Sequence, residues 1–233
     1  MHLRHLKLPG LTPYTRASSI QDGLVSQFLK HKASPTTTSL PAPTIITAQF
    51  NPVYTCGRRE IGTVSPEQQL FLKDSNRAEF HEALRGGQTT FHGPGQLIAY
   101  PILDLKTHSL TPRNYVCLLE KTVIKTLARY GVQAMTTENP GVWTSEDDKI
   151  CALGVHLRRN VSSHGIGLNV STDLGWFGRI VACGLEGKRT VSLQALGIRH
   201  VSVEDVGDAF VEEMALALKG IEGVREITEQ ELD

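Results

Sequence analysis

The order of strand-like and helical segments is the feature that most constrains the fold of this chain. Apolar residues recur at helical spacing in Ser18–Lys32, in the segment opened by Thr111 and Pro112, and after Ser202. β-Branched and apolar runs predict five strands, at Thr44–Phe50, Leu97–Leu105, Val142–Thr144, Ile150–Leu157 and Ile166–Val170. Because these strands are not evenly interleaved with helices, a mixed sheet is favoured over a doubly wound parallel one. We therefore predict a single α/β (α+β) domain over residues 1–233.

Proline and glycine suggest where this pattern is interrupted. Pro101 lies inside a predicted strand, which indicates an edge position or a bulge because proline has no N–H to donate. Asn51–Glu60 is interpreted as a turn-rich connection, and Ser65 followed by Pro66 predicts the start of a short helix. Arg85–Gln96 is expected to be mostly loop, with a short strand at Gln88–Phe91.

Charge, apolar runs and cysteine spacing exclude several classes of protein. The chain of 233 residues balances 24 Lys+Arg against 24 Asp+Glu, which argues against a generic nucleic-acid binder. Its apolar runs are too short for a membrane span. Its four cysteines form no C-x-x-C pair, so we predict neither a disulfide framework nor a metal site, and favour a reducing compartment.

The segment RGGQTTFHGPGQ at 85–96 is the first candidate site. Its glycines allow the backbone to approach a ligand closely, and exposed N–H groups in such loops bind anions or carbonyl oxygens. Arg85 would add a positive charge, and His92 a proton donor or acceptor. No G-K-[ST] or G-x-G-x-x-G spacing is present, which excludes a P-loop and a dinucleotide fingerprint. A tight turn between strands remains the alternative.

A cysteine and a lysine are the second candidate site. Cys183 stands beside a glycine, where a thiol at a turn can be exposed next to backbone N–H groups. Cys117 and Cys151 lie in apolar patterns and are expected to be buried, whereas the arginines beside Cys56 would lower the pKa of its thiol. Lys149 could activate Cys183, since an ammonium about 4 Å from a thiolate gains roughly 4 kcal/mol at an effective dielectric of about 20. Only the fold can bring the two together, and a solvated turn lysine is the alternative.

Longer strings of residues resemble one family, the lipoyl(octanoyl) transferases. They are NPVYTCGRR at 51–59, RGGQTTFHGPGQLIAYPILDL at 85–105, GVW at 141–143, KICALGVHLRR at 149–159, SSHGIGLNVSTDLGWF at 162–177 and CGLEGKRTVSL at 183–193. The resemblance implies a mixed-sheet fold shared with the biotin and lipoate protein ligases. The chain departs from the family at Ala182, where proline is frequent, and at Cys56, where leucine is frequent.

The resemblance also assigns roles to residues. It implies that Cys183 is the nucleophile and Lys149 its activator. The implied acyl-binding residues are Arg85, Gly86, Gly87, Gln88, Thr89, Thr90, Phe91, His92, Ala152, Leu153, Gly154, Gly165, Ile166 and Gly167. Secondary polar roles are expected for His92 and His164, and positions at the pocket mouth for Tyr54, Arg58 and Arg85. The small residues Gly154, Gly165 and Gly167 would leave room for the acyl tail.

The implied reaction is a ping-pong acyl transfer without a cofactor. Octanoyl-phosphopantetheine on acyl carrier protein would acylate Cys183, and a lysine of a lipoyl domain, in a 2-oxoacid dehydrogenase or the glycine cleavage H protein, would accept the group. The alternatives are an ATP-dependent lipoate or biotin protein ligase, a non-catalytic protein that binds acyl carrier or lipoyl domains, and a cysteine hydrolase. The eukaryotic character of GVW and STDLGWF predicts the mitochondrial matrix, with a bacterial cytoplasm as the alternative.

Overall fold

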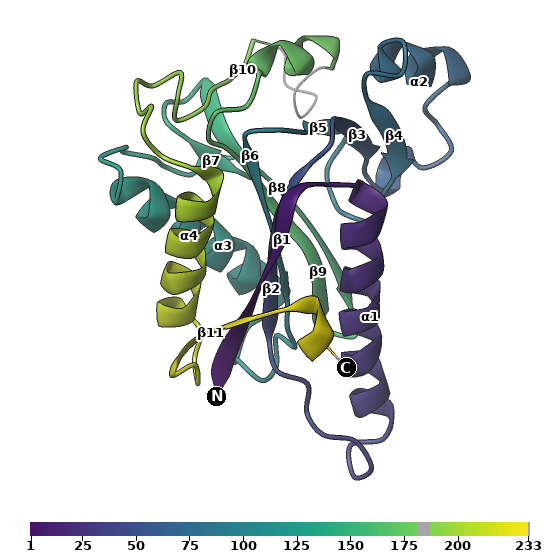
Figure 1. Cartoon of the computed structure of the whole chain (residues 1–233), viewed down its shortest axis with the longest axis vertical. Coiled ribbons are helices and arrows are strands. Elements are labelled where there is room, and N and C mark those ends of the chain that lie inside the picture. Colours follow the sequence, from purple (N-terminus) through teal and green to yellow (C-terminus); the bar gives the residue numbers. More distant parts are fainter. Residues whose placement is uncertain (181–186, 233) are drawn as a thin grey trace.

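A mixed eight-stranded sheet forms the centre of the computed structural model, which describes residues 1–180 and 187–232 (Figure 1). The spatial order of its main path is β10 (Arg189–Thr190), β8 (Asp148–Arg158), β9 (Val161–Asn169), β6 (Gln96–Ile102), β2 (Thr44–Phe50), β1 (His2–Thr12) and β11 (Gly223–Ile227), with β7 (Val142–Trp143) paired to β8. The pairs β1–β2, β1–β11 and β10–β8 are parallel and the others antiparallel. The predicted mixed α/β fold class is confirmed.

Helices cover both faces of this sheet (Figure 1). Helix α1 (Tyr14–Ala33) packs on one face through Leu24 and Phe28, within a core that includes side chains of β1, β2 and β6. Helices α3 (Pro112–Ala128) and α4 (Val203–Ala217) pack together on the other face, where Tyr115 and Phe210 belong to a larger core. None of the described helices is long and apolar enough to cross a membrane.

Local capping signals explain where these helices start. The side chain of Ser65 accepts a hydrogen bond from the backbone N–H of Gln68 at the start of α2 (Pro66–Lys73). Thr111 does the same for α3, and Ser202 with Asp205 forms a capping box on α4. Each cap satisfies a backbone N–H that the first helical turn leaves without a partner. The predicted helix starts at Pro66, after Thr111 and after Ser202 are confirmed.

A smaller sheet corrects the prediction for Asn51–Glu60. It consists of β4 (Glu79–Glu82), β3 (Val53–Cys56) and β5 (Thr90–His92), so part of the expected turn-rich connection is a buried strand. The 3-10 helix η1 (Arg58–Glu60) follows it. Strand β3 was not predicted because it has only four residues and turn-forming residues flank it. Strand β5 also starts two residues after the expected Gln88.

Pro101 occupies a central strand, which corrects the expected edge position. Strand β6 lies between β2 and β9, but it pairs with β9 only from Gln96 to Ala99. Pro101 lies past the end of that ladder, where its carbonyl accepts hydrogen bonds from the Ser162 hydroxyl (2.8 Å) and the Tyr115 hydroxyl (3.3 Å). Its missing N–H therefore removes no hydrogen bond from the β6–β9 pairing.

Candidate active site

Three segments line one pocket with mostly apolar walls. They are the loop and strand at 85–92, residues 152–154 of β8 and residues 164–167 of β9, together with Tyr100 from β6. The antiparallel pairing of β8 with β9 joins the last two segments, since Ala152 pairs with Gly167 and Gly154 with Gly165. All the predicted acyl-binding residues line this pocket except Gly86 and Phe91. The ring of Phe91 instead stacks on Trp176 in the core of the smaller sheet.

Arg85 fixes the loop that forms one wall of the pocket. Its guanidinium is buried and donates hydrogen bonds to the Thr55 carbonyl (2.5 Å), the Thr55 hydroxyl (2.8 Å), the Gly86 carbonyl (2.9 Å) and the Gln88 carbonyl (3.0 Å). These guanidinium N–H groups already donate to oxygen atoms of the protein. Arg85 therefore lies within the pocket wall, and its expected place at the pocket mouth is wrong.

We expect Arg85→Met to destabilise the protein by about 3 kcal/mol or more, because each buried carbonyl left without a donor costs about 1–3 kcal/mol. The exposed Arg58 provides the matched control, and Arg58→Met should change the free energy of unfolding by less than about 0.5 kcal/mol. Urea unfolding of the two variants measures the difference. Equal unfolding midpoints would show that the hydrogen bonds of Arg85 do not hold the loop.

Tyr54 and Arg58 also lie away from the places predicted for them. Tyr54 is fully buried in the core of the smaller sheet, where its hydroxyl donates to the Trp176 carbonyl at 2.6 Å. Burial raises the pKa of Tyr54 to about 12. Arg58 is exposed and is not among the residues that line the pocket. The predicted pocket mouth therefore contains neither side chain.

His92 belongs to a buried hydrogen-bond network at the pocket wall. Its Nδ1 lies 2.8 Å from the Gln96 side-chain oxygen, and the Gln96 amide donates to the Asn169 side-chain oxygen at 2.9 Å. Burial, together with the charge of Arg85, lowers the pKa of His92 to about 3. The imidazole is thus neutral at physiological pH and donates from Nδ1, which leaves Nε2 as an acceptor.

Two of the three glycines expected to leave room for the acyl tail allow neighbouring backbone segments to pack closely and do not provide space for a ligand. A Cβ atom at Gly165 would lie 2.2 Å from the Ala99 carbonyl oxygen, and one at Gly154 would lie 2.9 Å from the Gly86 carbonyl oxygen. These two glycines allow β9 to approach β6 and β8 to approach the loop. A Cβ at Gly167 would meet His92 at 3.4 Å. The expectation that all three glycines leave room for a ligand is therefore corrected for Gly154 and Gly165.

Lys149 lies in a second pocket that adjoins the first. The two pockets share Thr90, Ala152 and Gly167. Lys149 is only 7% exposed, its ammonium donates to the Pro140 carbonyl at 2.8 Å, and it lies 5.1 Å from the ring centroid of Trp143. This burial excludes the alternative of a solvated turn lysine.

Gly141 and Trp143 show why the GVW string matters for Lys149. Gly141 has φ +134°, and a Cβ there would lie 2.4 Å from the Lys149 Cε. Only glycine therefore combines this backbone conformation with the space that the lysine stem needs. Trp143 supplies the aromatic face under the ammonium, an arrangement favourable for a cation. The GVW string thus positions the side chain of Lys149.

Cys183 lies outside the described residues, but the described chain on both sides of 181–186 borders the pocket of Lys149. Phe177 and Thr190 both line that pocket, and Thr190 pairs with Lys149 in the parallel register of β10 and β8. The chain that follows Cys183 therefore returns to the strand of Lys149.

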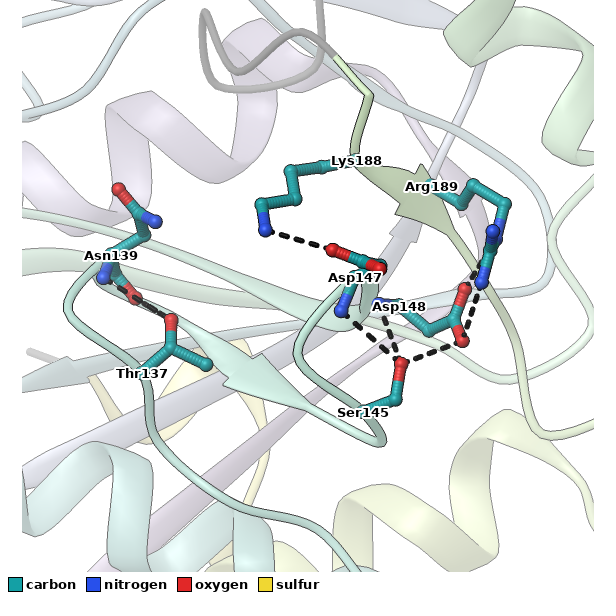
Figure 2. A network of polar contacts seen from close by, with 7 residues as sticks. All are labelled: Thr137, Asn139, Ser145, Asp147, Asp148, Lys188 and Arg189. Carbon is teal, nitrogen blue, oxygen red and sulfur yellow. Dashed lines mark hydrogen bonds and ion pairs between the residues drawn. The ribbon is translucent and has the colours of Figure 1, made fainter.

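Two ion pairs fasten this returning chain to the start of β8 (Figure 2). The ammonium of Lys188 lies 2.8 Å from Asp147, and the guanidinium of Arg189 lies 2.7 Å from Asp148. Ser145 donates to the same Asp148 carboxylate at 2.7 Å. The hydrogen bond from Arg189, and after it the one from Ser145, lowers the pKa of Asp148. The SEDD turn thus holds the segment beside Lys149.

Cys56 and Cys151 lie in surroundings that raise the pKa of a thiol. Burial and the nearby Glu82 and Glu60 raise the pKa of Cys56, so the expectation that its arginine neighbours lower that pKa is wrong. Cys151 lines the second pocket, and burial raises the pKa of its thiol strongly. Cys117 is exposed on α3, which corrects its expected burial.

Comparison with known proteins shows to which family this chain belongs. The model of the lipoyl protein ligase A/B catalytic domain matches residues 14–215. A Schizosaccharomyces pombe protein named "Probable octanoyltransferase" is 51% identical over 81% of this chain and 83% of its own. The chain belongs to the octanoyltransferases of this family.

Further relatives and solved structures agree with this membership. The Homo sapiens mitochondrial N-octanoyltransferase LIPT2, whose name gives octanoyl-acyl-carrier-protein as donor, is 38% identical over 87% of both chains. An octanoyltransferase of Caldanaerobacter subterraneus is 39% identical over 98% of this chain and 92% of its own. A lipoate protein ligase from Thermoplasma acidophilum shares the fold at a TM-score of 0.68 and 15% identity, over 99% of this chain and 88% of that one. The biotin protein ligase of Aquifex aeolicus shares it at 0.53 and 12%, over 94% and 69%.

Several residues that line the two joined pockets were not predicted from the sequence. Tyr100 lines the first pocket, and Asn169, Phe177 and Thr190 line the pocket of Lys149. All four lie within the strings that carry the family resemblance, so the signal was present in the sequence. The resemblance indicated which regions of the chain form the pockets, but it did not indicate which side chains line them.

Proposed function

We propose that this chain transfers an octanoyl group from acyl carrier protein to a lysine of lipoyl domains through a thioester on Cys183. One observation carries the proposal. A pocket with mostly apolar walls joins, through Thr90, Ala152 and Gly167, the pocket that contains the buried Lys149. The apolar tail of an octanoyl group would thus lie in the first pocket, and its reacting carbonyl would lie beside Lys149 in the second.

In the first half-reaction, the Cys183 thiolate attacks the thioester carbonyl of the carrier-bound octanoyl group. A new carbon–sulfur bond forms to Cys183, and the bond to the phosphopantetheine sulfur breaks, so the carrier leaves as a thiolate that takes up a proton. In the second half-reaction, the acceptor amine attacks the octanoyl-Cys183 carbonyl. The amide forms, the amine loses a proton, and the Cys183 thiolate is released.

Lys149 takes a different part in each half-reaction. Its ammonium stabilises the thiolate before acylation, since a nearby cation favours the charged form of a thiol. Once the thioester has formed, that negative charge is gone. The Lys149 ammonium has by then given its proton to the departing carrier thiolate, so the resulting amine can accept the proton that the incoming acceptor amine must lose.

Acyl carrier protein is the donor, and lipoyl domains of 2-oxoacid dehydrogenases and the glycine cleavage H protein are the acceptors. The names of the Danio rerio and Homo sapiens relatives give octanoyl-acyl-carrier-protein as the donor and a protein as the acceptor, which supports the donor and a protein acceptor. Those relatives are also named as mitochondrial, and the protein acts in the mitochondrion. No cofactor is required, because the thioester is already activated.

Transfer to an apo lipoyl domain without ATP tests the proposed function. Octanoyl-carrier protein and the apo domain are mixed with the enzyme, and intact-protein mass spectrometry follows the acceptor. We expect the acceptor to gain one octanoyl group, while a matched mixture with free octanoate and ATP gives none. Modification only in the matched mixture would identify an ATP-dependent ligase. A carrier complex without any modification in either mixture would identify a binding protein.

A further inference from the structure

The pocket lined by residues 85–92, 152–154 and 164–167 is the acyl-side pocket of the proposed function. A second hollow, separate from the pocket of Lys149, lies beyond one end of it. It has a volume of about 250 Å³ and is lined by α1, by residues 82–84 and by the ends of β8 and β9 that meet at their connection. Among the described residues, His164 is the one that lines both this hollow and the acyl-side pocket. His164 therefore stands between the two spaces.

His164 has an unfavourable conformation and an unfavourable environment. Its φ of +55° lies in the left-handed region that disfavours residues other than glycine. Its Nδ1 is buried and has no hydrogen-bond partner in the described part of the chain. Costs of this kind persist only where the surroundings impose them, and they gather at functional sites.

The surroundings contact His164 at its backbone and at its ring. Its backbone N–H donates to the side-chain oxygen of the buried Gln21 on α1 at 2.5 Å. Its ring lies edge-on to Tyr100 of β6, with the centroids 5.4 Å apart. The side chain is therefore fixed as a partition between the helix and the sheet.

The register of β8 and β9 places this partition at the end of the acyl-side pocket away from Lys149. The two pockets meet at the pair Ala152–Gly167, and His164 pairs with Val155, three residues further along. Three residues of a strand span about 10 Å. The terminal methyl group of an acyl chain whose carbonyl lies near Lys149 would point at His164.

We propose that His164 is the end wall of the acyl pocket and limits the length of the acyl chain that the enzyme accepts, an inference that rests on the proposed function. An octanoyl group would end against the imidazole. A longer chain would need the space of the second hollow, from which the His164 ring excludes it.

Replacement of His164 by glycine tests this wall, because glycine adopts the same backbone conformation without strain. Wild-type and His164→Gly proteins are offered an equal mixture of octanoyl- and dodecanoyl-carrier protein, and the two acyl-enzyme masses are compared. We expect the ratio of dodecanoyl to octanoyl adduct to rise about tenfold or more in His164→Gly, since each buried methylene is worth roughly fourfold in affinity. His164→Asn, which also tolerates the left-handed region and keeps a planar side chain, should stay within about threefold of the wild type.

A second substitution fills the hollow from the side of the helix. Val25 of α1 lines it, so Val25→Phe added to His164→Gly should return the ratio toward the wild-type value. An unchanged ratio in a folded His164→Gly protein that still takes up octanoyl groups would overturn the wall and leave the proposed function intact. A wild-type protein that takes an acyl group from neither carrier would overturn the proposed function and the wall together.

Discussion

We expect Cys183→Ala to abolish the octanoyl adduct and to lower transfer to the lipoyl domain by at least about a thousandfold. The proposed thioester intermediate needs a thiolate, and an alanine side chain has no nucleophile. Intact-protein mass spectrometry after mixing with octanoyl-carrier protein measures the adduct. Single-turnover assays with the apo lipoyl domain measure the transfer.

The exposed Cys117 provides the matched control for this result. Its thiol on α3 is accessible to any reactive acyl donor, whereas it lines neither of the two joined pockets. Cys117→Ala should therefore leave both the adduct and the transfer within about twofold of the wild type. An adduct that survives in Cys183→Ala and disappears in Cys117→Ala would mean that the observed acylation is chemical and not enzymatic.

Lys149→Arg separates the two half-reactions. Arginine keeps a positive charge near the thiol and can still lie on the face of Trp143, so octanoyl-Cys183 should form at a rate within about tenfold of the wild type. A guanidinium cannot give up its proton and therefore cannot act as a base. We expect the transfer to the acceptor amine to fall by about 10²–10⁴-fold. Single-turnover measurements on the preformed acyl-enzyme isolate this step.

Lys149→Met tests, in the same experiment, whether the charge of Lys149 or only the volume of its side chain is needed. Methionine fills part of the lysine stem beside Gly141 without a charge, so both half-reactions should slow. If Lys149→Arg supports both half-reactions as well as the wild type does, Lys149 is not the base. If Lys149→Met forms the acyl-enzyme as fast as the wild type, its charge does not stabilise the thiolate.

Local signals made a large part of this fold predictable. Thr44–Phe50 is a strand with the predicted bounds, and the caps at Ser65, Thr111 and Ser202 start their helices as expected. These features depend on the immediate neighbours in the chain. Strands β1 and β11 had no counterpart among the predicted strands. Each pairs in parallel with a strand distant in sequence, and the burial that stabilises them comes from those partners.

Patterns in the sequence indicated the candidate site better than they indicated what each side chain does there. The segments at 85–92, 152–154 and 165–167 do meet in one pocket. Successive side chains of a strand, however, point to opposite faces, and the sequence did not indicate which face lines the pocket. Phe91 points into the smaller core, while its neighbours Thr90 and His92 line the pocket. The buried place of Arg85 could not be foreseen either, because its partner Thr55 lies on a strand that the sequence did not reveal.

The return of the chain to Lys149 has an entropic consequence. Lys188, Arg189 and Thr190 lose conformational entropy when they lie beside β8. The pairing of Thr190 with Lys149 and the ion pairs of Asp147 and Asp148 offset this cost. Thr190 lines the pocket of Lys149, whereas Asp147 and Asp148 do not. The two carboxylates therefore help to keep one side of that pocket ordered from outside it.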